Sequence, residues 1–340
     1  MDPVRTSDHS LPEHHLALDL VRSTEAAAIA AAHWAGRGDK HSADQAAVDA
    51  MRAKMSTLPF NGVVVIGEGE KDEAPMLYNG EAVGDGRGPA YDVAVDPIDG
   101  TTLTAKGMSN ALSVLAASPR GSMFDPSALF YIDKLVTGPE AAALVDITAP
   151  VADNVRAVAR GKGVDPGHVT VCMLDRPRHK DLADQVRAAG ARVRFIPDGD
   201  VAGAVMAARE GTGIDMLLGI GGTPEGIIAA CAVKCLGGVL QARWAPRDEN
   251  ERRGVLDAGH DPDRVFCTDD LVTGDGAIFV ATGITDGDLM SGVRHGPDRA
   301  TTESLVMSSR SRTVLLVRSE HRIDPAGHTA PTATSTTTKA

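Results

Sequence analysis

The stretch Asp96-Pro97-Ile98-Asp99-Gly100-Thr101 constrains this chain more than any other part of it. The residues before it, 91–95, alternate polar and apolar side chains, which is typical of a half-buried strand. Because Pro97 cannot donate to a sheet ladder, we expect the strand to end at Asp96. Gly100 allows a ligand to approach the backbone closely, and the threonines after it can open a helix. The stretch thus predicts two carboxylates between a strand end and a helix N-terminus, where hard cations and a phosphate can be held together. Taken alone, an Asp-Pro turn followed by an Asp helix cap would explain the same residues.

The composition excludes several classes of protein. The 340 residues, 43% of them hydrophobic, suffice for one large domain or two packed subdomains. No run of 18 or more uncharged apolar residues exists, so we expect no membrane-spanning helix. The net charge of −12 argues against nucleic acid or an anionic membrane as the main partner. A phosphorylated substrate would need bridging cations.

The cysteines and histidines indicate the compartment and the kind of metal. The N-terminus lacks the apolar core of a signal peptide, and the four cysteines fit neither a disulfide framework nor a Cys-x-x-Cys pair. We therefore expect a reducing, cytoplasmic location. The 11 histidines form no ligand cluster, and the zinc-protease spacing His-Glu-x-x-His is absent. Oxygen-ligated Mg²⁺ or Mn²⁺ is accordingly the expected cofactor.

Two helices and an acidic strand end are expected in the first part of the chain. The first helix should cover 16–35, and the second should begin with Ser42 as N-cap in a capping box. Asp44 then lies in a first helical turn, and by itself is better explained as a helix-stabilising acid than as a metal ligand. The β-branched run 63–66 predicts a strand buried on both faces, followed by the acidic stretch 67–73. That stretch is either a ligand site at a sheet edge or a solvated loop.

The second half repeats the order strand, turn, helix. The turns are Asp175-Arg176-Pro177-Arg178-His179, Pro197-Asp198-Gly199-Asp200 and Gly219 to Gly226. This alternation predicts a mostly parallel sheet that brings the three turns to one edge, where two arginines would suit a phosphate. Thr223 as N-cap and Pro224 at the first helical position place Glu225 in a first turn. The segments 277–282, 303–308 and 313–318 predict added antiparallel strands.

Together these stretches resemble the class II fructose-1,6-bisphosphatases of bacteria. In chain order, the matching stretches are Gly36 to Lys40, Gly67 to Glu70 with Asp72 to Pro75, Asp96 to Thr101, Pro177 to His179, Asp198 to Asp200, and Gly219 to Gly226. Single motifs among them occur throughout the lithium-sensitive sugar and inositol phosphatases, whereas the combination is specific to class II. The resemblance covers about residues 16–318. It implies an α/β fold of layered α/β/α/β/α type with mixed sheets.

The resemblance also implies a set of site residues. The metal ligands would be Asp44, Glu68, Asp96, Asp99 and Glu225. Some relatives have Glu at the position of Asp99. The aspartate side chain is one methylene shorter than glutamate, so its reach to the metal is shorter. Residues on the substrate would be Asp99, Gly100 and Thr101 at the 1-phosphate, then Tyr131, Arg176, Pro177, Arg178, Asp198, Gly199, Asp200 and Gly222, with Lys40 as a charge partner. From the sequence alone, core packing is the better explanation of Tyr131.

The implied activity is metal-dependent hydrolysis of fructose 1,6-bisphosphate at its 1-phosphate, a step of gluconeogenesis. Thr101 would position the attacking water, and Asp96, Asp99 and Glu68 complete the catalytic set. The alternatives are an inositol monophosphatase-like activity, a sedoheptulose-1,7-bisphosphatase activity, or a phosphosugar sensor without turnover. The pair Arg176 and Arg178 favours a substrate with a second phosphate. A homodimer or homotetramer is plausible.

We expect four segments along the chain. Residues 1–15 would be a flexible N-terminus, and 16–160 a metal-binding subdomain. A change of composition at Arg160-Gly161-Lys162-Gly163 suggests that a sugar-phosphate-binding subdomain follows over 161–322. The Thr- and Pro-containing residues 323–340 would be a disordered tail.

Overall fold

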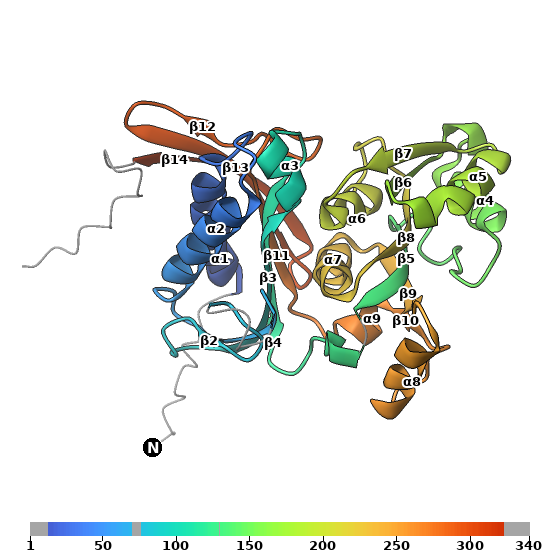
Figure 1. The fold of residues 1–340 in the computed structure, drawn as a ribbon, viewed down its shortest axis with the longest axis horizontal. Helices are drawn as coiled ribbons and strands as arrows, with labels where there is room; N and C mark the ends of the chain where they lie inside the picture. Colours follow the sequence, from blue (N-terminus) through green and yellow to red (C-terminus); the bar gives the residue numbers. More distant parts are fainter. Residues whose placement is uncertain (1–12, 70–75, 129, 323–340) are drawn as a thin grey trace, which may run out of the picture.

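The fold consists of two β-sheets separated and flanked by helices (Figure 1). The computed structural model describes residues 13–69, 76–128 and 130–322. The first sheet has the order β12-β13-β11-β4-β3-β1-β2, with β14 paired to β13. Its strands are β1 Asn61–Ile66, β2 Ala82–Val83, β3 Ala90–Asp99, β4 Leu112–Pro119, β11 Ile278–Gly283, β12 Arg294–His295, β13 Arg299–Ser308 and β14 Thr313–Arg322.

The second sheet has the order β10-β9-β5-β8-β6-β7. Its strands are β5 Tyr131–Thr137, β6 Thr170–Leu174, β7 Arg192–Ile196, β8 Met216–Gly222, β9 Val239–Trp244 and β10 Val265–Cys267. Three of them, β7, β6 and β8, run parallel, but β5 pairs antiparallel with β8 and β9, and β9 does so with β10. The expected mostly parallel sheet is therefore correct only for the three strands with helical crossovers.

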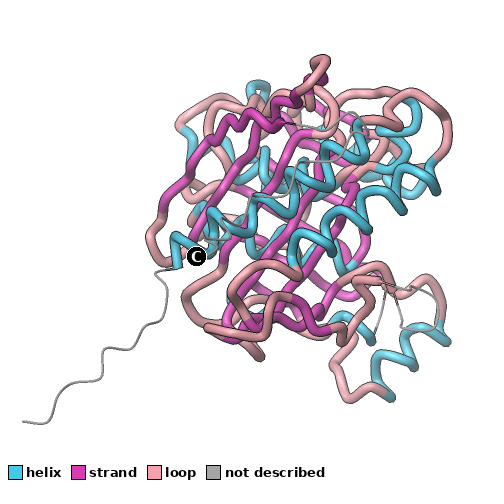
Figure 2. The backbone as a smooth tube through the Cα atoms, turned by 90° about the vertical axis from the view of Figure 1, so that its left-hand side faces the viewer, coloured by secondary structure: helices cyan, strands magenta, loops and turns pink. Residues whose placement is uncertain are grey.

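Helices form three layers around the sheets. The α-helices are α1 Glu13–Ala32, α2 Lys40–Met55, α3 Thr101–Lys106, α4 Val151–Lys162, α5 Lys180–Ala188, α6 Asp200–Ala208, α7 Thr223–Leu236, α8 Glu249–Asp257 and α9 Thr268–Leu271. Short 3₁₀ turns are η1 Pro126–Ala128, η2 Pro166–His168 and η3 Pro177–His179. Helices α1 and α2 cover the outer face of the first sheet (Figure 2), and α4 and α5 cover that of the second. Helices α6 and α7 lie between the sheets, which confirms the layered α/β/α/β/α prediction.

The central layer explains why α6 and α7 are apolar on all sides. One continuous core joins Ala94 and Val114 of the first sheet to Leu217 of the second through both helices. A helix packed on both faces by sheets has no solvent side, so it carries no polar stripe. No helix among the described residues is long and apolar enough to cross a membrane.

Several element boundaries differ from the sequence-based expectation. The first helix begins at Glu13 and ends at Ala32, so three residues of the expected flexible N-terminus are helical. Residues 1–12 and 323–340 lie outside the described residues. The predicted division between residues 160 and 161 falls inside α4, while the chain changes sheet after β4 and returns with β11. The three C-terminal antiparallel strands are confirmed as β11, β13 and β14.

The N-cap of α2 is not the expected Ser42. Asp39 is the N-cap, and its carboxylate accepts hydrogen bonds from the Ser42 amide at 3.0 Å and hydroxyl at 2.7 Å. The helix begins at Lys40, and Asp44 consequently lies beyond the first turn. A helix-dipole role for Asp44 is weakened by this shift, because the dipole acts mainly on the first turn. Similarly, α7 has Gly222 as N-cap, so Thr223 is already helical, while Glu225 remains in the first turn.

Strand β3 does not end at Asp96, contrary to expectation. It continues through Pro97 to Asp99, and its register against β4 shifts between Asp96 and Asp99. A strand accommodates proline at such an irregularity because no ladder hydrogen bond is required there. The shift brings both aspartates to the same end of the sheet. The run 63–66 also departs from expectation, since buried and half-buried residues alternate along β1.

Candidate active site

A cleft of about 690 Å³ opens where strands of both sheets end. The first sheet contributes the ends of β1 and β3 with the start of α3, and the second contributes the ends of β6 and β8 with the starts of α6 and α7. The predicted site residues in its wall are Asp44, Glu68, Asp96, Asp99, Gly100, Thr101, Tyr131, Arg176, Arg178, Asp198, Gly199, Asp200, Gly222 and Glu225. Segments up to about 180 residues apart are thus gathered in one place, as the strand-end argument predicts.

Two predicted site residues do not line this cleft. Pro177 begins η3 and lies between the two lining arginines. Lys40, the first residue of α2, donates from Nζ to Thr102 Oγ1 at 2.8 Å and therefore contacts α3 beside Thr101. In the acidic stretch, Glu70, Lys71, Asp72 and Glu73 lie outside the described residues, as do Ala74 and Pro75 of the matching motif.

The acids of the cleft repel one another. Burial is the main cause that raises the pKa of Glu68 to about 7, and the negative charge of Asp44 is the second cause. Burial, and then the charges of Asp99 and Glu68, raise the pKa of Asp96 well above its usual value. Burial also raises the pKa of Asp44. A site that disfavours its own negative charge to this extent favours the binding of cations.

Asp99 lies deepest among these acids. It is 3% exposed, and its Oδ2 accepts a hydrogen bond from the Ala202 amide of α6 at 3.1 Å. Burial and the charge of Asp200 raise the pKa of Asp99, while the Ala202 hydrogen bond opposes that rise. Asp99 accordingly joins the end of β3 to the first turn of α6. This contact links the two sheets at the floor of the cleft.

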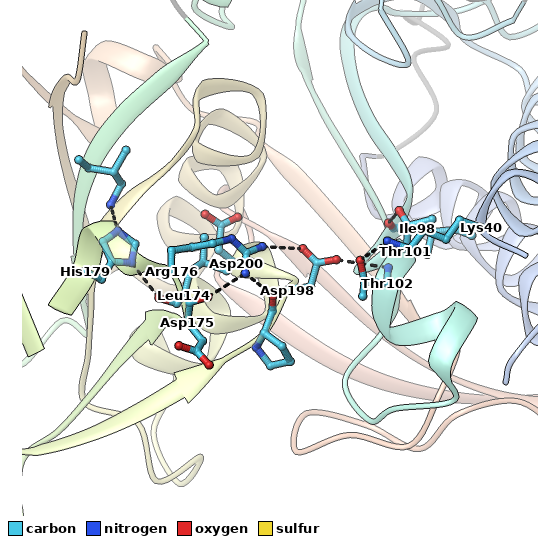
Figure 3. A network of polar contacts seen from close by, with 12 residues as sticks. Lys40, Ile98, Thr101, Thr102, Leu174, Asp175, Arg176, His179, Asp198 and Asp200 are labelled. Carbon is cyan, nitrogen blue, oxygen red and sulfur yellow. Dashed lines mark hydrogen bonds and ion pairs between the residues drawn. The ribbon is translucent and has the colours of Figure 1, made fainter. Parts of the chain in front are cut away.

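Asp198 makes a second link across the cleft (Figure 3). Its Oδ2 accepts from the Thr102 amide at 3.3 Å, and its Oδ1 lies 3.6 Å from Arg176 Nη2. On the same side, Thr101 Oγ1 donates to the Ile98 carbonyl at 3.4 Å. The Thr101 hydroxyl is therefore held weakly, at a distance from which a closer acceptor could take over the hydrogen bond.

The two arginines approach the cleft from η3. Arg176 donates to the Pro197 carbonyl at 2.7 Å, and Arg178 donates to the Ile220 carbonyl at 2.7 Å. The Arg178 guanidinium also stacks over the Tyr131 ring, 5.6 Å from its centroid. Tyr131 is half-buried and lines the cleft, so core packing does not explain it. Guanidinium groups held in this way remain able to bind a phosphate in a bidentate manner.

His179 fixes the turn that carries these arginines. The ring is 2% exposed; its Nε2 accepts from the Ile220 amide at 2.9 Å, and its Nδ1 lies 2.8 Å from the Leu174 carbonyl. With one nitrogen accepting and the other facing a carbonyl, the ring is neutral and donates from Nδ1. Burial lowers the pKa of His179, in agreement with that state.

Glu225 has a carboxylate oxygen that is suited to a ligand. Its Oε2 is buried and has no hydrogen-bond partner among the described residues. Buried polar atoms are normally satisfied, so such an oxygen is suited to a ligand. The donors here are carboxylate oxygens, which match Mg²⁺ or Mn²⁺ better than softer metals. Within the described ranges, however, no three Asp, Glu, His or Cys side chains are close enough to form a preformed metal cluster.

Comparison with known proteins identifies the family. The family model "Bacterial fructose-1,6-bisphosphatase, glpX-encoded" matches residues 14–321. The chain belongs to this family. The "Fructose-1,6-bisphosphatase class 2" of Haemophilus influenzae is 44% identical over 322 residues, which cover 91% of this chain and 96% of that protein. The "Fructose-1,6-bisphosphatase 1 class 2" of Escherichia coli is 42% identical over the same shares of both chains. Membership in the class 2 fructose-1,6-bisphosphatase family confirms the resemblance found in the sequence.

Sequence reasoning missed several residues of the cleft. Asn79, Ser127, Phe130 and Ile228 line it, and Phe130 is 61% exposed with its ring edge-on to Tyr131. Lys134, in the middle of β5, does not line the cleft itself but donates to Asp200 of the cleft wall at 2.5 Å. For Lys134 a signal existed, because a lysine within an apolar strand needs a buried partner.

Proposed function

We propose that this class 2 fructose-1,6-bisphosphatase hydrolyses the 1-phosphate of fructose 1,6-bisphosphate, giving fructose 6-phosphate and inorganic phosphate. One observation carries the proposal: acidic side chains from five segments and two arginines line the same cleft. Acids alone would indicate a cation site, and arginines alone an anion site. Their combination suits a substrate with a phosphate at each end.

The family is one of metal-dependent phosphatases, and we assign the metal to the acidic side of the cleft. Asp44, Glu68, Asp96, Asp99 and Glu225 would hold Mg²⁺ or Mn²⁺. When bound, such ions polarise phosphoryl oxygens and lower the pKa of a coordinated water. The unpartnered Glu225 oxygen and the raised pKa values of the neighbouring acids support this assignment.

Thr101 is our choice for the residue that orients the attacking water. Its hydroxyl is at the start of α3, next to Gly100, and its hydrogen bond to Ile98 is long at 3.4 Å. A nearby carboxylate, Glu68 or Asp96, would accept the proton of the water. Gly100 and Asp99 would contact the 1-phosphate. Positioning and electrostatics are sufficient here, because phosphoryl transfer needs little covalent help from the protein.

The opposite side of the cleft would bind the rest of the substrate. Arg176 and Arg178, with the Tyr131 ring stacked against Arg178, would hold the second phosphate. Asp198, Gly199 and Asp200 would face the sugar hydroxyls. A second phosphate distinguishes this substrate from an inositol monophosphate, whereas the arginines do not separate six-carbon from seven-carbon sugars.

Phosphate release tests the proposal directly. Fructose 1,6-bisphosphate, sedoheptulose 1,7-bisphosphate and inositol 1-phosphate would be compared with Mg²⁺ or Mn²⁺, with EDTA, and with added Li⁺. We expect metal-dependent release from fructose 1,6-bisphosphate that Li⁺ suppresses. Release from inositol 1-phosphate in preference would contradict the assignment of the arginines. Binding of one equivalent of bisphosphate without turnover would instead indicate a sensor.

The cellular setting is proposed on chemical grounds. We place the enzyme in the cytoplasm because Cys172, Cys231, Cys235 and Cys267 are all free thiols. We place it in gluconeogenesis because the proposed reaction forms fructose 6-phosphate from fructose 1,6-bisphosphate. A homodimer or homotetramer is the expected state, which light scattering of the purified protein would establish.

A further inference from the structure

Lys134 is the buried cation of this site. Among the described residues it is the only lysine or arginine that is buried, with 2% of its surface exposed. It lies in β5, between β8 and β9 in the interior of the second sheet. Its Nζ donates to Asp200 Oδ2 at 2.5 Å and lies 3.5 Å from the Gly222 carbonyl oxygen. The Asp200 side chain is only 8% exposed, so water contributes little to either charge.

Glycine at position 221 makes room for this pair. A Cβ at Gly221 would lie 2.1 Å from Asp200 Oδ2 and 2.7 Å from Lys134 Nζ. Gly221 pairs with Ile132 on the ladder between β5 and β8, so the strand backbone itself forms the wall against which the ion pair packs. A larger residue there would displace one of the two charges. The position of Asp200 is therefore set by Lys134 on one side and by the strand on the other.

The charge balance of the cleft depends on this lysine. Asp200 lines the cleft together with the acids Asp99 and Glu225. Without Lys134, Asp200 would be a buried carboxylate without its ion-pair partner, next to other acids. Removing one partner of a buried ion pair is strongly destabilising, while neutralising both is much less so.

We infer that Lys134 is a positioning residue of this enzyme, which acts through Asp200. The ammonium group holds the Asp200 carboxylate at the wall of the cleft, with Gly222 next to it, in the orientation that receives the sugar hydroxyls. The inference rests on the proposed function, because it takes Asp200 as a sugar-binding residue. It assigns no direct contact between Lys134 and the substrate, since Lys134 does not line the cleft.

A double-mutant cycle tests the inference. The variants are Lys134→Met, Asp200→Asn and the two combined, and Lys162→Met is the matched control. Lys162 forms ion pairs with Asp215 at 2.6 Å and with Glu140 at 3.3 Å away from the cleft, so its loss removes a lysine–carboxylate interaction without touching the site. The measurements are KM and kcat for fructose 1,6-bisphosphate, and Tm of the enzyme in EDTA. The Tm measurement does not depend on turnover or on bound metal.

Lys134→Met should raise KM roughly tenfold or more, with a much smaller change in kcat, because Asp200 loses its orientation. It should also lower Tm by about 5–10 °C, and Asp200→Asn added to it should recover part of that loss. The double variant should have the KM of Asp200→Asn alone. The control should keep the wild-type KM.

The results that would overturn the inference are equally specific. A wild-type KM in Lys134→Met would remove the role of Lys134, and so would a double variant in which the two KM effects multiply. If Lys134→Met does not fold, the KM of the double variant is compared directly with that of Asp200→Asn, and the two values should be equal. A double variant that does not fold would contradict the pairing argument. Failure of the proposed function looks different, because the wild-type enzyme would then release no phosphate from fructose 1,6-bisphosphate.

Discussion

The substitution Gly222→Ala should weaken metal binding and leave the stability of the fold nearly unchanged. Gly222 is the N-cap of α7, with φ −65° and ψ 144°, which any L-residue can adopt. A Cβ at this position would nonetheless lie 1.8 Å from Glu225 Oε2 and 2.7 Å from its Cδ. The backbone is therefore not strained by the substitution, and the Glu225 carboxylate must move. Because Glu225 is a proposed metal ligand, the effect should fall on metal affinity.

The expected size of the effect of Gly222→Ala follows from the group that it displaces, the Glu225 carboxylate. The displaced group is the end of a flexible side chain, and its Oε2 has no partner to lose among the described residues. The free energy of unfolding in EDTA should therefore change by less than about 1 kcal/mol, as for substitutions outside the core. Misplacing a ligand group typically weakens metal binding about 10- to 100-fold. Phosphate release titrated with Mn²⁺ should show this as a shift of the half-saturating metal concentration.

A second glycine provides the control. Gly254 in α8 has no atom within 4 Å of an added Cβ. Gly254→Ala should keep the wild-type metal dependence and stabilise the helix by about 0.5–1 kcal/mol. If Gly222→Ala has the metal dependence of the wild type, Glu225 is not a ligand or has room to move without loss. Wild-type metal dependence of Gly222→Ala would therefore refute this reasoning, whichever of the two explanations holds.

Three further predictions concern Thr101, Arg178 and His179. Thr101→Ala should lower kcat about 100-fold or more with unchanged metal dependence, and full turnover would exclude its role in orienting water. Arg178→Met should raise KM for fructose 1,6-bisphosphate roughly tenfold but not for a sugar monophosphate; equal changes for both substrates would contradict a second-phosphate site. The pKa of His179 is lowered in the folded chain, so its contribution to stability is present above the unfolded pKa of about 6.5 and lost as the pH falls through the folded pKa. His179→Gln should therefore reduce the loss of Tm between pH 7 and pH 5; an unchanged loss would show that the ring is not held neutral.

Local patterns predicted the elements on which the site is built. The stretch from Asp96 to Thr101 does join a strand to a helix, and Glu225 does lie in the first turn of α7. Strand periodicity and glycine-rich turns act over a few residues, so a sequence alone contains them. In open α/β sheets, ligands bind at the carboxyl ends of the strands, and this rule predicts that the separate stretches meet at one cleft.

The predictions for the N-cap of α2 and for the end of β3 are wrong because the local sequence permits two structures at each place. Both Asp39 and Ser42 are good N-caps, and the structure uses the aspartate because its carboxylate can bind both the amide and the hydroxyl of Ser42. Pro97 can end a strand or occupy a bulge, and pairing with β4 on either side of it favours the bulge. These choices depend on neighbours that only the folded chain supplies.

Contacts between distant segments depend on how the sheets and helices pack, which no short pattern encodes. Asp198 and Thr102 are 96 residues apart, and Asp200 and Lys134 are 66 apart. Their partners could not be identified from spacing, yet the need for a partner could. A lysine on the same strand face as apolar residues, as Lys134 is with Ile132 and Val136, must either reach solvent or meet a buried acid, since an unpaired buried charge is too costly. The acids expected at the strand ends were the available partners, and packing of α6 against the second sheet selected Asp200.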